Sequence, residues 1–272
     1  MSGRSEALTY AFADPTGAMC GVARLGLTDE GASGLVLLFH EGAVLDVRAD
    51  GDADSAASVD AVQAAGLRSE PVEDGRRWRI AYEGGTPFAL EFEAQAEPFT
   101  LDPGERAAKA GGMEGIDHLC RVTGTVGGRP FDGLGQRGRS WGTPDWDKMT
   151  LARTVSAWFD AEHAINAVAI RPAKASHHAD EAISAFLLRE DGPAAVADPR
   201  LSTTYDAEQR QRAAGLELYV GADDEYPVRV AGEVVAGTSL DLGRLRLDCA
   251  FFRWRMQGRA GVGRYDILRR AE

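Results

Sequence analysis

The residues best suited to chemistry are gathered in one segment, 137–147, which reads Arg-Gly-Arg-Ser-Trp-Gly-Thr-Pro-Asp-Trp-Asp. Indole rings are costly to leave in water, and their N–H groups need partners when buried. Arginine makes planar two-point contacts with carboxylates or stacks on aromatic rings. The segment is therefore either a buried structural knot or the floor of a ligand pocket. Its candidate residues are Arg137, Arg139, Trp141, Asp145 and Trp146.

Asp145 is the candidate general acid of this segment. A carboxyl group between indole walls has its charged form disfavoured by desolvation, which raises its pKa and lets it donate a proton. The alternative is an ion pair with Arg137 or Arg139, which lowers the pKa and locks the loop. Trp141 and Trp146 either line a cavity and stabilise a developing cation through the ring face, or cap a barrel.

Arg139, Tyr265, Trp254 and His118 are further candidates. Arg139 either anchors an anionic group of a substrate or forms an internal ion pair. Tyr265 either donates a proton or hydrogen bond within a cavity, or is a core residue whose hydroxyl group is hydrogen-bonded. Trp254, also on the last strands, likewise either faces a cavity or is a core residue. His118 follows Asp117, and adjacent side chains in a strand point to opposite faces, so these two are not expected to act as a dyad. One of them can still face a cavity.

The overall charge excludes several classes of partner. The chain has 272 residues, with 30 Lys and Arg against 42 Asp and Glu, which gives a net charge of −12. No basic stripe is present to neutralise phosphates, so we expect no nucleic acid and no anionic membrane as partner. The longest apolar run, 35–39, is far too short for membrane insertion. Oligomerisation stays possible, since an edge strand can pair with a partner.

Cofactor and metal motifs are missing from the sequence. Cys20, Cys120 and Cys249 are an odd number at wide spacing, which matches neither a disulfide framework nor a zinc site. The adjacent His177 and His178 lack acids at ligand spacing. We therefore expect no metal and no cofactor. The N-terminus has no apolar signal region, and together with the cysteine usage this predicts a cytoplasmic protein.

Alternating patterns predict an all-β fold. Residues 120–126 alternate between apolar and polar types, and Gly127 and Gly128 supply the positive φ angles of a tight hairpin. Residues 244–251 alternate in the same way. The best helix candidates are 53–67 and 102–109. Two runs of strands divide the chain, and we place the boundary between domains of residues 1–128 and 129–272.

Two stretches resemble a known family. Val122-Thr-Gly-Thr-Val, the glycine hairpin and Asp132-Gly-Leu-Gly-Gln-Arg-Gly-Arg-Ser-Trp-Gly-Thr-Pro-Asp-Trp resemble the signature of AttH-like and carotenoid 1,2-hydratase-like proteins, roughly V-x-G-x-V and then G-x-R-D-H-S-W-G-x-R-D-W. Phe252-Arg-Trp-Arg-Met-Gln-Gly-Arg-Ala-Gly-Val-Gly-Arg-Tyr resembles the closing strand pair of that family. The resemblance covers about residues 115–270, and the N-terminal part only in strand content.

This resemblance implies two tandem lipocalin-like β-barrel or sandwich units with few short helices and an apolar cavity. Relatives include hydratases and cyclases that act on terpenoid or polyketide-like substrates without a redox cofactor. We therefore expect a cofactor-independent enzyme that hydrates, cyclises or isomerises a terpenoid, carotenoid or other lipid-like molecule. Whether it is a lyase, a cyclase or an isomerase stays open. The alternative is a non-catalytic carrier of a hydrophobic ligand.

One departure from the family pattern affects the expected chemistry. Gly138 and Arg139 stand where the family commonly has Asp-His, so its natural proton donor and orienting partner are missing, whereas Asp145 keeps its family position. The catalytic candidates are therefore Asp145, Arg139 and Tyr265. The candidates for ligand binding are Trp141, Trp146, Arg137, His118 and Trp254.

Overall fold

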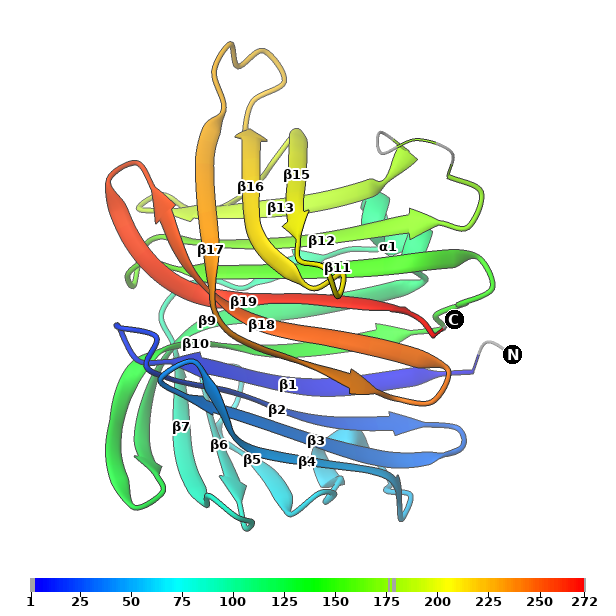
Figure 1. Cartoon of the computed structure of the whole chain (residues 1–272), viewed down its shortest axis with the longest axis vertical. Coiled ribbons are helices and arrows are strands. Elements are labelled where there is room, and N and C mark those ends of the chain that lie inside the picture. Colours follow the sequence, from blue (N-terminus) through cyan, green and yellow to red (C-terminus); the bar gives the residue numbers. More distant parts are fainter. Residues whose placement is uncertain (1–2, 176, 178–179, 272) are drawn as a thin grey trace. The chain divides into compact units, whose positions relative to one another are not determined.

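Strands whose side chains alternate between a buried and an exposed face dominate the computed structural model, which describes residues 3–175, 177 and 180–271 (Figure 1). The prediction of an all-β fold with two tandem lipocalin-like units is confirmed. Unit 1 comprises Met1–Thr100 and Glu114–Pro144, and unit 2 comprises Leu101–Met113 and Asp145–Glu272. His178, one of the two adjacent histidines weighed as metal ligands, lies outside the described residues.

Unit 1 is one antiparallel sheet in the order β4-β3-β2-β1-β10-β9-β7-β6-β5, with β8 paired to β9 beside this path. Strands β5 to β7 run steeply across the direction of β1 to β4 (Figure 1), so the sheet curls over its inner face. The strands are β1 (Ser5–Ala13), β2 (Met19–Thr28), β3 (Gly31–His40), β4 (Ala43–Ala53), β5 (Leu67–Glu73), β6 (Arg77–Tyr82), β7 (Phe88–Ala94), β8 (Phe99–Leu101), β9 (Met113–Val126) and β10 (Arg129–Gly142).

The core of unit 1 is rich in aromatic rings. Tyr10 and Phe12 point to the inner face of β1, where each makes an edge contact with the ring of Phe92. The short 3-10 turn η1 (Val59–Ala61) adds Val59 and Val62 to the same core. The predicted helix at 53–67 is wrong, because β4 continues to residue 53 and these valines anchor an irregular connection.

The predicted glycine hairpin joins β9 to β10. Gly127 and Gly128 have φ angles of 56° and 75°, a region that glycine enters without steric cost. The sequence-based boundary at 128/129 thus falls inside a hairpin of unit 1, and the observed division comes after β10. The register of β10 against β1 places Arg137 opposite Tyr10, so both side chains lie on the inner face.

Unit 2 repeats this strand order as β14-β13-β12-β11-β19-β18-β17-β16-β15. Strands β15 to β17 again run steeply across β11 to β13 (Figure 1). The strands are β11 (Met149–Trp158), β12 (Ala164–Pro172), β13 (Ala182–Arg189), β14 (Gly192–Ala195), β15 (Asp198–Tyr205), β16 (Gln211–Tyr219), β17 (Val228–Asp241), β18 (Leu245–Met256) and β19 (Arg259–Arg270).

A single short α-helix is seen in the described part of the chain. It is α1 (Arg106–Gly111), close to the predicted helix at 102–109, and it ends at Gly112 with a φ angle of 64°. Although it connects two strand runs of unit 1, it packs on β11, β12 and β13 of unit 2. None of the helices in the described part has the length and apolar character needed to cross a membrane.

Candidate functional site

The inner face of unit 2 holds a buried ion pair. Arg153 on β11 and Glu181, which directly precedes β13, have 0% and 1% of their side-chain surface exposed. Arg153 Nε donates to Glu181 Oε1 at 2.9 Å, and Nη2 donates to Oε2 of the same carboxylate. Burial alone lowers the pKa of Arg153, but the nearby oxygens of Tyr265 and Glu181 raise it more, so the guanidinium stays charged.

Two hydroxyl groups extend this pair into a network. Arg153 Nη1 donates to Thr203 Oγ1 at 2.9 Å and to the Tyr265 hydroxyl at 3.3 Å. The two hydroxyl oxygens lie 2.5 Å apart. Burial raises the pKa of the Tyr265 phenol, and the charge of Arg153 opposes part of that rise. The phenol is therefore neutral at physiological pH and acts as a hydrogen-bond donor.

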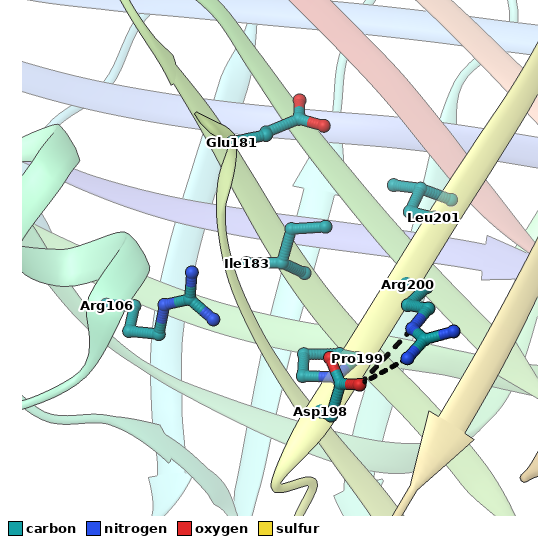
Figure 2. A pocket seen from close by; sticks show the side chains of 7 residues that line it. All are labelled: Arg106, Glu181, Ile183, Asp198, Pro199, Arg200 and Leu201. Carbon is teal, nitrogen blue, oxygen red and sulfur yellow. Dashed lines mark hydrogen bonds and ion pairs between the residues drawn. The ribbon is translucent and has the colours of Figure 1, made fainter. Parts of the chain in front are cut away.

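A pocket of about 300 Å³ opens onto this network. Glu181 is one of the residues that line the pocket, and its buried carboxylate is bonded to Arg153. Figure 2 shows helix α1 contributing Arg106 on one side and β15 contributing several residues on the other. The lining residues are Arg106, Glu181, Ile183, Asp198, Pro199, Arg200 and Leu201.

The two arginines of the pocket differ in their partners. Arg200 donates to Asp198 at 2.8 Å and lies over the ring of Tyr219, with its guanidinium carbon 4.8 Å from the ring centroid. Arg106 forms no ion pair with any residue in the described part of the chain. It is the cation in this pocket that is available to a negatively charged oxygen of a ligand.

Unit 1 carries a second polar cluster on its inner face. The Tyr10 hydroxyl and Ser69 Oγ are 2.6 Å apart. The guanidinium carbon of Arg137 lies 4.7 Å from the centroid of Trp78, and the ring of His118 is 4.8 Å from that of Trp78. Strands β1, β5, β6, β9 and β10 each supply one of these residues. The structure thus brings the sequence candidates Arg137 and His118 together.

Burial shifts the acid–base behaviour of this cluster. Desolvation, and secondarily the charge of Arg137, lowers the pKa of His118 to about 4, so its imidazole is neutral at pH 7. Burial raises the pKa of Tyr10, and Arg137 opposes part of that rise. At neutral pH the cluster therefore has one charged member, the guanidinium of Arg137.

Arg139 and Trp141 lie further along the inner face of β10, towards its more exposed end. Arg139 bonds Glu6 Oε1 at 2.6 Å and lies 3.4 Å from Asp60 Oδ2. It therefore forms internal ion pairs, one of the two roles expected for it. The indole N–H of Trp141 donates to Glu114 Oε2 at 3.3 Å.

Asp145 is placed differently from the general acid that the sequence favoured. Its side chain is 30% exposed and forms an ion pair with Lys148 at 3.0 Å. The hydrogen bond from Lys148, followed by that from the Asp147 backbone, lowers the pKa of Asp145. This matches the ion-pair alternative in direction, although the partner is Lys148 and not Arg137 or Arg139. Trp146 is half-buried and packs against Met149 and its neighbours in unit 2.

The other C-terminal candidates lie in the core of unit 2. Trp254 is fully buried and stacks on Phe252, with 5.3 Å between ring centroids. Tyr265 packs against Phe252 as well, and its hydroxyl reaches Arg153. The structure therefore brings Tyr265 into the buried network and leaves Trp254 as a core residue beside it.

Sequence reasoning missed Arg153, Glu181 and Arg106. Arg153 did carry a signal, because it shares its strand face with Val155 and Ala157, and a charge on a buried face calls for a partner. The sequence held no comparable signal for Glu181, which lies 28 residues from Arg153. Among the described residues, no group of three His, Cys, Asp or Glu side chains is arranged to hold a metal ion.

Comparison with known proteins gives one family. The model of a domain of unknown function, DUF7064, matches residues 3–271. The chain belongs to this family. No curated protein matches the sequence.

Solved structures show the fold of this DUF7064 protein in other chains. A crystal structure of CghA with Sch210972 aligns with a TM-score of 0.72 and 12% identity, over 99% of this chain and 89% of that one. Kievitone hydratase from Nectria haematococca aligns with a TM-score of 0.65 and 10% identity, over 98% and 89% of the two chains. At these sequence identities the likeness establishes a shared fold. This fold agrees with the one implied by the resemblance to hydratase-like proteins.

Proposed function

We propose that this protein is a cofactor-independent enzyme that acts by proton transfer on a small, largely apolar molecule bound in the pocket of unit 2. One observation carries the proposal: the pocket of about 300 Å³ has a buried carboxylate, Glu181, in its wall. A buried charge is costly unless it is paired or used. Here Arg153 holds it in position beside a space where a ligand fits.

Glu181 is the proposed base. Each oxygen of its carboxylate accepts a hydrogen bond from Arg153, and Glu181 is also one of the residues that line the pocket. Arg153 is a positioning residue, as are Thr203 and Tyr265, which bond the far side of its guanidinium.

Arg106 is the proposed electrophilic partner. Removal of a proton next to a carbonyl group, or addition of water to a conjugated double bond, places negative charge on the carbonyl oxygen. A guanidinium stabilises such a charge. Arg106 is an exposed residue that lines the pocket, so it can reach a carbonyl oxygen at the entrance. Glu181 and Arg106 together therefore suit enolate chemistry, whose outcome is hydration, cyclisation or double-bond isomerisation. Ile183, Pro199 and Leu201 provide apolar walls for the rest of the substrate.

The names of structural neighbours agree with this class of reaction. One neighbour is a hydratase of kievitone, and another was crystallised with the compound Sch210972. Chemistry that begins with protonation of an alkene is less well supported in this chain. Its expected acid, Asp145, has a lowered pKa and a partly exposed side chain that is paired with Lys148.

Solvent isotope uptake tests the proposal without knowledge of the substrate. The purified protein is incubated in deuterium oxide with a panel of conjugated ketones and β-dicarbonyl compounds, and mass spectrometry follows deuterium incorporation. We expect catalysed incorporation into at least one member. Ile183→Trp fills the pocket and should abolish incorporation, whereas Thr204→Trp, on the exposed face of β15, should retain it.

The same experiment separates an enzyme from a carrier. A compound that binds the unaltered protein but not Ile183→Trp binds in the pocket. If such a compound takes up no deuterium, the non-catalytic alternative is indicated. Incorporation that survives Ile183→Trp would place the chemistry elsewhere and refute the assignment of this pocket.

A further inference from the structure

Arg137 is a buried cation whose charge is not balanced by a carboxylate. Its residue surface is 6% exposed, and it forms no ion pair with any residue that the structure describes. Its contacts are the face of Trp78 and the nearby hydroxyl of Tyr10. A ring face attracts a guanidinium but does not use its N–H donors. Buried guanidinium groups are normally paired, because removing a charge from water is costly.

The nearest acids of unit 1 have other partners. Glu6 and Asp60 lie on the same side of the sheet, and both form ion pairs with Arg139. Arg137 and Arg139 therefore differ in their partners and exposure, although they are two residues apart on the same face of β10. Arg139 has two carboxylates and a side chain that is 37% exposed, whereas Arg137 is buried and has none among the described residues.

Two nitrogen atoms at this place have no hydrogen-bond partner in the described part of the protein. They are Arg137 Nε and His118 Nδ1, on the adjacent strands β10 and β9. Both residues are more than nine-tenths buried, with 6% and 8% of their surface exposed. Buried polar atoms are nearly always satisfied, so each such atom requires an explanation. Both residues contact Trp78, so one acceptor group can serve Arg137 Nε–H together with His118 in the tautomer that carries its proton on Nδ1.

Unit 2 shows what satisfies such a guanidinium. There Arg153 is bonded by both oxygens of Glu181, beside a tyrosine and a threonine hydroxyl. Unit 1 has the arginine, the tyrosine and a serine hydroxyl, but no described carboxylate in the place of Glu181. The partner that unit 1 lacks is therefore a carboxylate, which matches the guanidinium fork with two parallel hydrogen bonds.

We propose that the inner face of unit 1 binds the carboxylate of a small apolar acid, with Arg137 as the principal contact and His118 and Tyr10 as further hydrogen-bond partners. The exposed fraction rises along the inner face of β10 from Arg137 to Arg139, so the apolar part of the ligand extends towards the end of the strand that carries Trp141. This site is separate from the pocket of unit 2 and does not depend on the reaction proposed there.

Calorimetry with hexanoate and hexanol as probes tests this site. These molecules share an apolar chain and differ in the carboxylate. We expect hexanoate to bind the full-length protein at least tenfold more tightly than hexanol, because a charge-assisted pair of hydrogen bonds is lost with the alcohol. Arg137→Met should weaken hexanoate binding at least tenfold and leave hexanol binding unchanged.

Matched variants keep the test decisive. Arg121→Met removes an exposed arginine of β9 that pairs with Asp132, and it should bind hexanoate as the unaltered protein does. Arg137→Lys keeps the positive charge but loses the two parallel N–H donors of the guanidinium, so its affinity for hexanoate should be intermediate. This variant also provides the test if Arg137→Met does not fold. Equal affinity for hexanoate and hexanol, hexanoate binding that survives both Arg137 variants, or equal thermal stabilisation by sodium chloride would overturn the proposal.

Discussion

The two units have the same strand order but complete their inner faces in different ways. Each brings an arginine, a tyrosine and a hydroxyl side chain together, with tyrosine–hydroxyl distances of 2.6 Å in unit 1 and 2.5 Å in unit 2. The tyrosine lies on β1, the first strand of unit 1, and on β19, the last strand of unit 2. The arginine lies on β10, the last strand of unit 1, and on β11, the first strand of unit 2. Unit 2 adds Glu181, whereas unit 1 has no described counterpart.

This difference separates a structural role from a binding role for the same kind of residue. The charge of Arg153 is neutralised by Glu181, so removing Arg153 takes away a bonded partner of a buried carboxylate. Among the described residues, the charge of Arg137 forms no ion pair and lies beside Trp78, His118 and the hydroxyl group of Tyr10, so removing Arg137 breaks no ion pair there. A duplicated fold can therefore keep one buried cation for stability and offer the other to a ligand.

The largest effect is expected from breaking the pair in unit 2. Arg153→Met removes the guanidinium that is bonded to both oxygens of the buried Glu181 carboxylate and should lower the free energy of unfolding by about 3–5 kcal/mol, as measured by urea denaturation. The double variant Arg153→Met/Glu181→Leu removes both charges and should regain most of that loss. A double variant as unstable as the single one would show that the ion pair is not the cause.

Acid should destabilise unit 1 through His118. Its pKa is about 4 in the folded chain and 6.5 in the unfolded chain, so the unfolded state binds more protons between these values. Stability from this residue is therefore complete above pH 6.5 and is lost as the pH falls towards 4. Allowing for partial solvent screening, we expect a loss of about 2 kcal/mol.

The contribution of His118 is isolated by comparison with His118→Phe, which should have a shallower dependence of unfolding free energy on pH in this window. An NMR titration of the His118 ring provides the direct value. A midpoint near 6.5 would contradict the buried, neutral imidazole and weaken its role beside Arg137.

Arg137→Met is expected to change stability much less than Arg153→Met. It loses a cation–π contact with Trp78 but also removes an unpaired buried charge, so the net change in unfolding free energy should stay within about 1 kcal/mol. Urea denaturation of both variants under the same conditions makes the comparison. A loss as large as that of Arg153→Met would mean that Arg137 has a structural partner of equal strength.

Asp145→Asn should have the smallest effect. The carboxylate is partly exposed and paired with Lys148, so we expect any turnover detected by deuterium uptake to change by less than about twofold. Lys148→Ala serves as a control for the ion pair. A loss of turnover of a hundredfold or more in Asp145→Asn alone would restore this residue as the acid that the sequence first favoured.

Much of the fold follows from local patterns in the sequence. Alternation over 120–126 and the glycines at 127 and 128 predicted a hairpin that the structure contains, because two-residue spacing and positive φ angles are local properties. The helix expected at 53–67 failed because its valines pack into a core that is formed by strands distant in the sequence. The observed division after β10 also depends on long-range pairing of β10 with β1.

The candidate sites were less accessible to sequence reasoning. The grouping of Arg137 and His118 depends on strands that converge only in the folded sheet, although each residue was a candidate on its own. Asp145 was a candidate acid because it lies between Trp141 and Trp146 in the sequence, with an ion pair to Arg137 or Arg139 as the alternative, but its ion-pair partner in the structure is Lys148. Glu181 was missed because its pairing with Arg153 joins β11 to the start of β13, two strands that are separated by β12 in the sheet.

NMR of the arginine Nε–H groups during titration with hexanoate tests the difference between the two units most directly. The Arg137→Met and Arg153→Met variants assign the two buried signals. The account predicts that the Arg137 signal shifts and saturates with hexanoate, while the Arg153 signal, already bonded to Glu181, stays in place. A shift of Arg153 alone, or no shift of Arg137 at saturating hexanoate, would contradict it.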